Sequence, residues 1–167
     1  MGVLVRVLAF LIICLSGYTQ AEDIQKLRME WLSQKQDSLV AEIRVAKKVE
    51  LLPMMETLGQ LWLRRDGALA TEVAPYIAEI IIREPALAFS WFSEHPTEFN
   101  EFVTQSQYSI FTDYAIDAEI QIEMEYLRQR LVLASAEFGS SNQGELLIKM
   151  AEKLSKKVQA IKVRVVD

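Results

Sequence analysis

The stretch IQIEMEYLRQRLVLASAEF, residues 120–138, carries apolar side chains at alternating steps of four and three residues. A second stretch, from Leu147 to Val165, steps in the same way. This spacing aligns apolar side chains along one face of an α-helix, as in helices that pack at shallow angles in a coiled-coil-like seam. Both stretches therefore predict long helices, and seams of this length also allow a homodimer.

In the rest of the chain, the apolar residues also follow a helical spacing, and prolines and glycines separate one predicted helix from the next. Residues 24–52 predict another long helix, and residues 54–66, 71–84 and 85–94 predict shorter ones. A further helix is expected after Pro96, with a break between Ser106 and Asp113.

The breakers and caps give the expected helix ends. Gly67 is expected to end the helix before it, Pro75 to lie in a first turn, and Thr97 to cap the helix after Pro96. The segment Lys162–Val166 is too short to indicate a strand, and no segment alternates with period two. The predicted fold class is all-α: a single-domain helical bundle of residues 22–167, with long N- and C-terminal helices and shorter central helices.

The first residues predict a secretory signal peptide. Arg6 precedes an apolar run from Val7 to Leu15, which is shorter than the roughly 20 residues that a membrane span needs. Thr19-Gln20-Ala21 then has the small-x-small pattern of a cleavage site. Residues 1–21 are therefore expected to be removed after Ala21, with an uncleaved anchor as the alternative. The protein is expected to be exported, and the favoured location is the bacterial periplasm.

Removal of this segment would leave 146 residues without the only cysteine, Cys14, and with a formal net charge of −6. Such a chain has no thiol nucleophile, thiolate metal site or redox centre. A pI near 5.1 and the lack of a basic run argue against a nucleic-acid partner. No cofactor is predicted, and the mature chain is expected to have no membrane span.

Charge is unevenly distributed along the mature sequence. Residues 84–127 hold nine acidic residues and no lysine or arginine, whereas residues 128–167 hold eight basic and four acidic residues. One interpretation is an acidic surface that attracts a cationic partner. The other is that the C-terminal helix packs beside the acidic helices and neutralises them.

The residues that usually carry chemistry do not form a known catalytic pattern. His95, the only histidine, lies between two predicted helices, and no serine stands in a nucleophile elbow. Asp113/Asp117 and Glu119/Glu123 are spaced to share helix faces, which leaves a divalent-cation or small-ligand site and, less favoured, a hydrolase as alternatives.

Aromatic residues next to this acidic segment suggest a contact surface. Trp91 and Phe92 lie in a helix with more aromatic residues than one buried stripe needs, although such residues are more often part of a core. The sequence therefore predicts a non-enzymatic protein that binds a protein partner, possibly basic, of the inhibitor, immunity, chaperone or assembly-accessory type. The candidate contact residues are Trp91, Phe92, Asp113, Asp117, Glu119 and Glu123.

Overall fold

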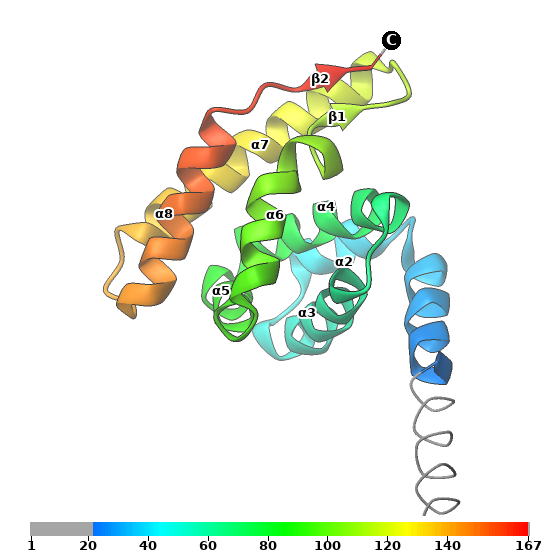
Figure 1. Cartoon of the computed structure of the whole chain (residues 1–167), viewed down its shortest axis with the longest axis horizontal. Coiled ribbons are helices and arrows are strands. Elements are labelled where there is room, and N and C mark those ends of the chain that lie inside the picture. Colours follow the sequence, from blue (N-terminus) through cyan, green and yellow to red (C-terminus); the bar gives the residue numbers. More distant parts are fainter. Residues whose placement is uncertain (1–21, 167) are drawn as a thin grey trace, which may run out of the picture. The chain divides into compact units, whose positions relative to one another are not determined.

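The computed structural model describes residues 22–166 in two parts. The described portion of the first part is a helical segment, residues 22–35, followed by a turn. The second part runs from Ser38 onward and holds all the elements labelled in Figure 1. The predicted signal peptide, residues 1–21, lies outside the described residues.

The second part consists of seven helices and two very short strands, which confirms the predicted all-α class. In chain order they are α2 (Leu39–Val45), α3 (Lys48–Leu63), α4 (Gly67–Arg83), α5 (Pro85–Glu94), α6 (Pro96–Ser109), β1 (Thr112–Asp113), α7 (Ala118–Gly139), α8 (Glu145–Gln159) and β2 (Arg164–Val165). Within residues 22–166, no helix is both long and apolar enough to cross a membrane.

Helix α4 is the centre of this part. It packs against α2, α3, α5, α6 and α7, and Figure 1 shows it among them. Six of its apolar residues have no exposed surface: Val73, Ala74, Ile77, Ala78, Ile80 and Ile81. A helix that is apolar around most of its circumference is a buried core helix, because each of its sides needs a neighbour. A single carboxylate, that of Glu79, interrupts this surface at 3% exposure.

Helices α7 and α8 form an antiparallel hairpin that buries the apolar stripes of both. Leu131, Leu154 and Val158 have no exposed surface. Arg128 on α7 also links the two helices. It donates two hydrogen bonds of 2.7 Å to Glu125 on its own helix and a longer one to the carbonyl of Val158 on α8. This bidentate contact lowers the pKa of Glu125 to about 2. The predicted helix over residues 120–138 is confirmed.

Two predicted helix extents are wrong. Residues 24–52 do not form one helix, because the helical segment ends at residue 35, and α2 and α3 are separate after it. The C-terminal helix ends at Gln159, and Arg164–Val165 forms β2, which pairs in parallel with β1. The backbone N–H of Arg164 donates to the carbonyl of Phe111 at 3.0 Å.

The expected helix ends also need correction. Gly67 begins α4 rather than ending α3, because Asp66 caps α4 by accepting a hydrogen bond from the N–H of Leu69 at 2.8 Å. Pro75 lies well inside α4 instead of in a first turn. The N-cap of α6 is His95, not Thr97.

One glycine is required by close packing. Gly59 on α3 lies against the indole ring of Trp91 on α5, and a Cβ atom at residue 59 would collide with ring atoms Cζ2 and Cε2. Trp91 is itself held, since its Nε1 donates to Glu56 at 3.1 Å. The closeness of α3 and α5 therefore depends on the missing side chain.

We predict that Gly59→Ala destabilises the protein by about 1–3 kcal/mol, the usual cost of overpacking a core. Chemical denaturation followed by circular dichroism measures this change. Gly67→Ala is the matched control, because apart from its chain neighbours and its own helix backbone no atom lies within 4 Å of the added Cβ. Equal stability of the two variants would show that α5 can shift without cost.

Candidate functional site

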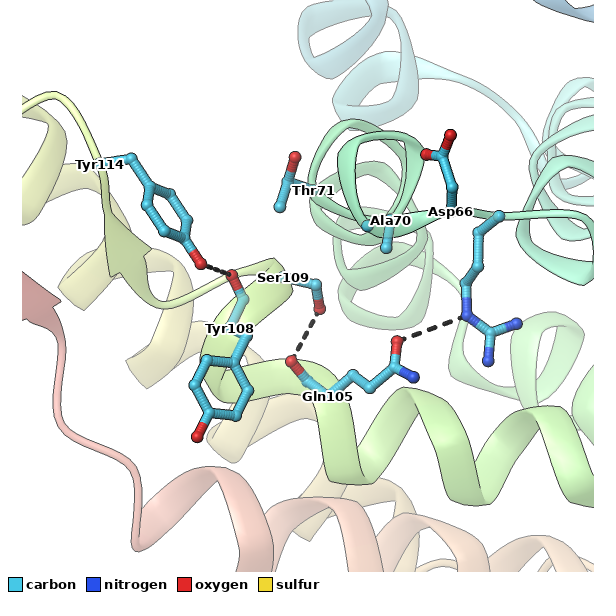
Figure 2. Close-up of a pocket in the computed structure, with 9 residues that line it drawn as sticks. Asp66, Ala70, Thr71, Gln105, Tyr108, Ser109 and Tyr114 are labelled. Carbon is cyan, nitrogen blue, oxygen red and sulfur yellow. Dashed lines mark hydrogen bonds between the residues drawn. The ribbon is translucent and has the colours of Figure 1, made fainter. Parts of the chain in front are cut away.

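A pocket of about 560 Å³ opens between the start of α4, the end of α6 and the loop that follows β1 (Figure 2). Its lining mixes aromatic, amide, hydroxyl and charged side chains: Arg65, Asp66, Gly67, Ala70, Thr71, Gln105, Tyr108, Ser109 and Tyr114. Its volume lies within the range of about 300–1,000 Å³ that is typical of ligand pockets.

The Arg65 side chain is fixed on one side of this pocket. Its guanidinium lies 4.0 Å from the centre of the Trp62 ring and forms an ion pair with Glu98 on α6. It also lies 3.8 Å from a carboxylate oxygen of Glu101, and its Nε reaches the amide oxygen of Gln105 at 3.5 Å. Because stacking and charge pairing act together, Arg65 is a rigid wall of the pocket.

The hydroxyl groups at the pocket are used by the helices that carry them. Ser109 donates to the carbonyl of Gln105 at 3.0 Å, as Figure 2 shows, and Thr71 donates to the carbonyl of Ala68 at 2.7 Å. Neither hydroxyl donates to a side chain that could act as a base.

Two tyrosines flank the opening. Tyr108 and Tyr114 are 60% and 59% exposed. The hydroxyl of Tyr114 donates to the carbonyl of Tyr108 at 3.3 Å (Figure 2). The hydrogen bond ties the loop after β1 to the end of α6. Both rings therefore stand at the surface, and that of Tyr114 is held by this bond.

The loop that carries Tyr114 is organised by Asp113. This residue is 1% exposed, and its carboxylate accepts hydrogen bonds from the backbone N–H groups of Ala115, Ile116 and Asp117 at 2.8, 3.0 and 2.8 Å. The side-chain amide of Gln121 donates a fourth at 2.9 Å. These bonds, that of Gln121 first, hold the pKa of Asp113 below its usual value, because they favour the charged form.

Ile116 takes a strained conformation in this loop. Its φ is +57°, in the left-handed region that a β-branched residue rarely adopts, and it is 62% exposed. Such strain persists only where surrounding contacts hold it, and it is concentrated at functional sites. The hydrogen bonds to Asp113 supply those contacts, and Ile116 stays exposed two residues after Tyr114.

The structure separates the residues that the sequence suggested as one contact surface. Trp91 is 9% exposed and Phe92 has no exposed surface, so both lie in the aromatic core rather than on a surface. Asp113 is buried in the loop, and Asp117 caps α7 by accepting from the N–H of Glu119 at 2.8 Å. Glu119 and Glu123 are exposed on α7.

The remaining acidic residues of the block are largely paired. Glu98 and Glu101 face Arg65, and Glu84 lies 3.2 Å from Lys48. Helix α8 does pack beside α5, α6 and α7. Within the described residues, however, none of its lysines forms an ion pair with those helices; Lys153 instead donates to Asn100 at 2.6 Å.

The other candidate groups have structural partners. The Nδ1 atom of His95 lies 2.9 Å from the carbonyl of Trp91, and the two rings stack with centroids 4.1 Å apart. Among residues 22–166, no three His, Cys, Asp or Glu side chains are grouped closely enough to hold a metal ion.

Sequence reasoning missed Tyr108, Tyr114 and Arg65 as pocket residues. The only signal was the expected helix break between Ser106 and Asp113, which contains Tyr108. No known protein family, curated protein or solved structure matches this chain.

We predict that Asp113→Asn lowers the melting temperature, because an amide offers one acceptor oxygen where the carboxylate offers two. The depressed pKa means that the stabilising contribution is fully present above the unfolded value of about 3.9 and is lost as the pH falls through the folded value. The difference from wild type should therefore be larger at pH 7 than at pH 3, which lies below the unfolded pKa. Thermal denaturation at both pH values measures it.

Asp117→Asn serves as the control, since asparagine caps helices as well as aspartate does. A loss of stability at Asp113→Asn that does not change with pH would contradict the role of the ionised carboxylate.

Proposed function

We propose that this chain is an exported helical protein that binds a protein partner through the pocket flanked by Tyr108 and Tyr114. The observation that carries the proposal is that these two exposed rings, one at the end of α6 and one on the loop held by Asp113, border a pocket of about 560 Å³. The classes of partner-binding protein that remain are inhibitor, immunity protein, chaperone and assembly accessory.

Tyrosine suits such a surface for physical reasons. Its ring gives a large contact area, it loses little conformational entropy when it binds, and its hydroxyl can pair with a partner. Here the loop is already ordered before binding, because Asp113 accepts three backbone hydrogen bonds from it. A preorganised contact surface binds more tightly than a flexible one, since less ordering is required on association.

The charge near the loop favours a basic partner. Ile116 is followed by Asp117, Glu119 and Glu123, which are exposed in and after the cap of α7. Their charge would speed encounter with a cationic surface. This interpretation keeps the α7 part of the acidic surface suggested by the sequence and replaces Trp91 and Phe92 with the two tyrosines.

We predict that the double variant Tyr108→Ala/Tyr114→Ala weakens partner binding by tenfold or more, as expected for aromatic residues at the centre of an interface. The partner is first isolated by photo-crosslinking from residue 114 in the exported fraction. Its affinity is then measured with purified wild type and variant by isothermal titration calorimetry.

Tyr126→Ala is the matched control, because Tyr126 is 58% exposed but lies outside this pocket. If the double variant and the control bind the partner as tightly as wild type does, the tyrosine pocket is not the contact surface.

We also predict that the exported protein begins at Glu22. Mass spectrometry of the intact protein from the exported fraction checks whether its mass is that of a chain that starts at Glu22. A thiol reagent should find no cysteine in it. Retention of Cys14 in the isolated protein would contradict cleavage after Ala21.

A further inference from the structure

A second, smaller pocket lies beside the C-terminal end of α4 and is independent of the tyrosine pocket. It has a volume of about 310 Å³, and its lining combines three arginines with one phenol and one aliphatic side chain: Arg44, Ile82, Arg83, Tyr126 and Arg130. These residues come from α2, α4 and α7, and both α2 and α7 pack against α4.

The buried carboxylate of Glu79 positions two of these arginines. Nη2 of Arg44 donates to Oε1 of Glu79 at 2.6 Å, and Nη1 of Arg130 donates to the same oxygen at 3.0 Å. Nη2 of Arg130 lies 3.0 Å from Oε2 as an ion pair, although that oxygen accepts no hydrogen bond. Helices α2 and α7 thus meet α4 through one carboxylate.

Positive charge remains after this pairing. One carboxylate balances one guanidinium, so Arg44, Arg83 and Arg130 together with Glu79 carry a formal net charge of +2. Arg83 is exposed, and no carboxylate of residues 22–166 lies within ion-pair distance of it. Glu123 acts on Arg44 electrostatically without forming an ion pair, so it reduces the excess but does not remove it.

The guanidinium groups are also accessible and oriented. The side chains of Arg44 and Arg130 are 47% and 23% exposed although both contact Glu79. The guanidinium of Arg130 lies 5.3 Å from the centre of the Tyr126 ring, which limits its rotation. Planar guanidinium groups held in this way suit the oxygen atoms of phosphate, because the N–H donors that Glu79 does not use can form charge-assisted hydrogen bonds with an anion.

We propose that this pocket binds a phosphate dianion, either free or carried by a small molecule. Two excess positive charges match the charge of a phosphate group better than that of a single carboxylate. Ile82 and the Tyr126 ring border the pocket and give an attached organic group an apolar surface to contact. In this proposal Arg44 and Arg130 hold the anion between them and Arg83 closes the site from the last turn of α4.

The test is titration of the isolated protein with inorganic phosphate and, separately, with glycerol 3-phosphate. Sodium chloride keeps the ionic strength constant, and NMR chemical shifts of arginine side chains or calorimetry report binding. Saturable binding of either probe supports the proposal. Binding of inorganic phosphate alone identifies the free anion as the ligand class, and tighter binding of glycerol 3-phosphate identifies a phosphate ester.

Arg83→Gln is the informative variant, because Arg83 takes no part in pairing Glu79 and its loss should leave the fold intact. We expect about tenfold weaker binding, which corresponds to the loss of one charge-assisted hydrogen bond. Arg64→Gln is the matched control: Arg64 is exposed and precedes the N-terminal end of α4, whereas Arg83 is at the C-terminal end. The two ends of α4, Gly67 and Arg83, are about 24 Å apart at 1.5 Å per helical residue. The proposal is overturned if neither probe shows saturable binding. It is also overturned if Arg83→Gln and Arg64→Gln lose affinity equally.

Discussion

A carboxylate in the middle of a core helix imposes a strong constraint on everything that packs around it. Glu79 lies on α4 among residues with no exposed surface, and it is 3% exposed. An unpaired charge there would cost several kcal/mol, so the helices that cover it must supply cations. Arg44 of α2 and Arg130 of α7 do so, at 2.6 and 3.0 Å. This pairing sets where both helices contact α4.

The second buried acidic residue has a similar effect on a smaller scale. Among residues 22–166, Glu79 and Asp113 are the two charged residues that are buried. Asp113 is paired with backbone N–H groups instead of arginines, so it shapes a loop rather than joining helices. In both places the carboxylate lies inside, and the groups that it arranges lie at the surface: guanidinium groups in one case, and Tyr114 and Ile116 in the other.

The sequence predicted the helices with the strongest periodicity well. Residues 120–138 and 85–94 were expected to be helical and are, because apolar spacing and Pro85 act locally. Prolines were misleading: the helix predicted over residues 54–66 starts directly after Pro53, yet Pro53 lies inside α3, and Pro75 lies inside α4. A proline inside a helix costs about 3 kcal/mol. Burial of both helices outweighs this cost, and such burial is decided by distant parts of the chain.

The candidate site could be predicted less well, for a related reason. A run of acidic residues has the same appearance in a sequence whether its members are paired, buried or exposed. Asp113 and Glu119 are six residues apart, yet one is 1% exposed and the other faces solvent. The pocket also depends on Arg65 meeting Glu98 and on Asp113 capping its own loop. No spacing rule links residues 65 and 98, so the tyrosine pocket became visible only in three dimensions.

The pairing of β1 with β2 determines when the tyrosine pocket can be completed. The segment that leads into the loop after β1 is joined to residues about 50 positions later: Arg164 donates to the carbonyl of Phe111, Val166 donates to that of Asp113, and Gln107 donates to that of Lys162. A ribosome makes these later residues after residues 107–113, and contacts between distant segments form slowly. A nascent chain that has already folded α2 to α6 still lacks a finished tyrosine pocket. Synthesis itself therefore delays completion of the proposed binding surface until the chain has reached β2.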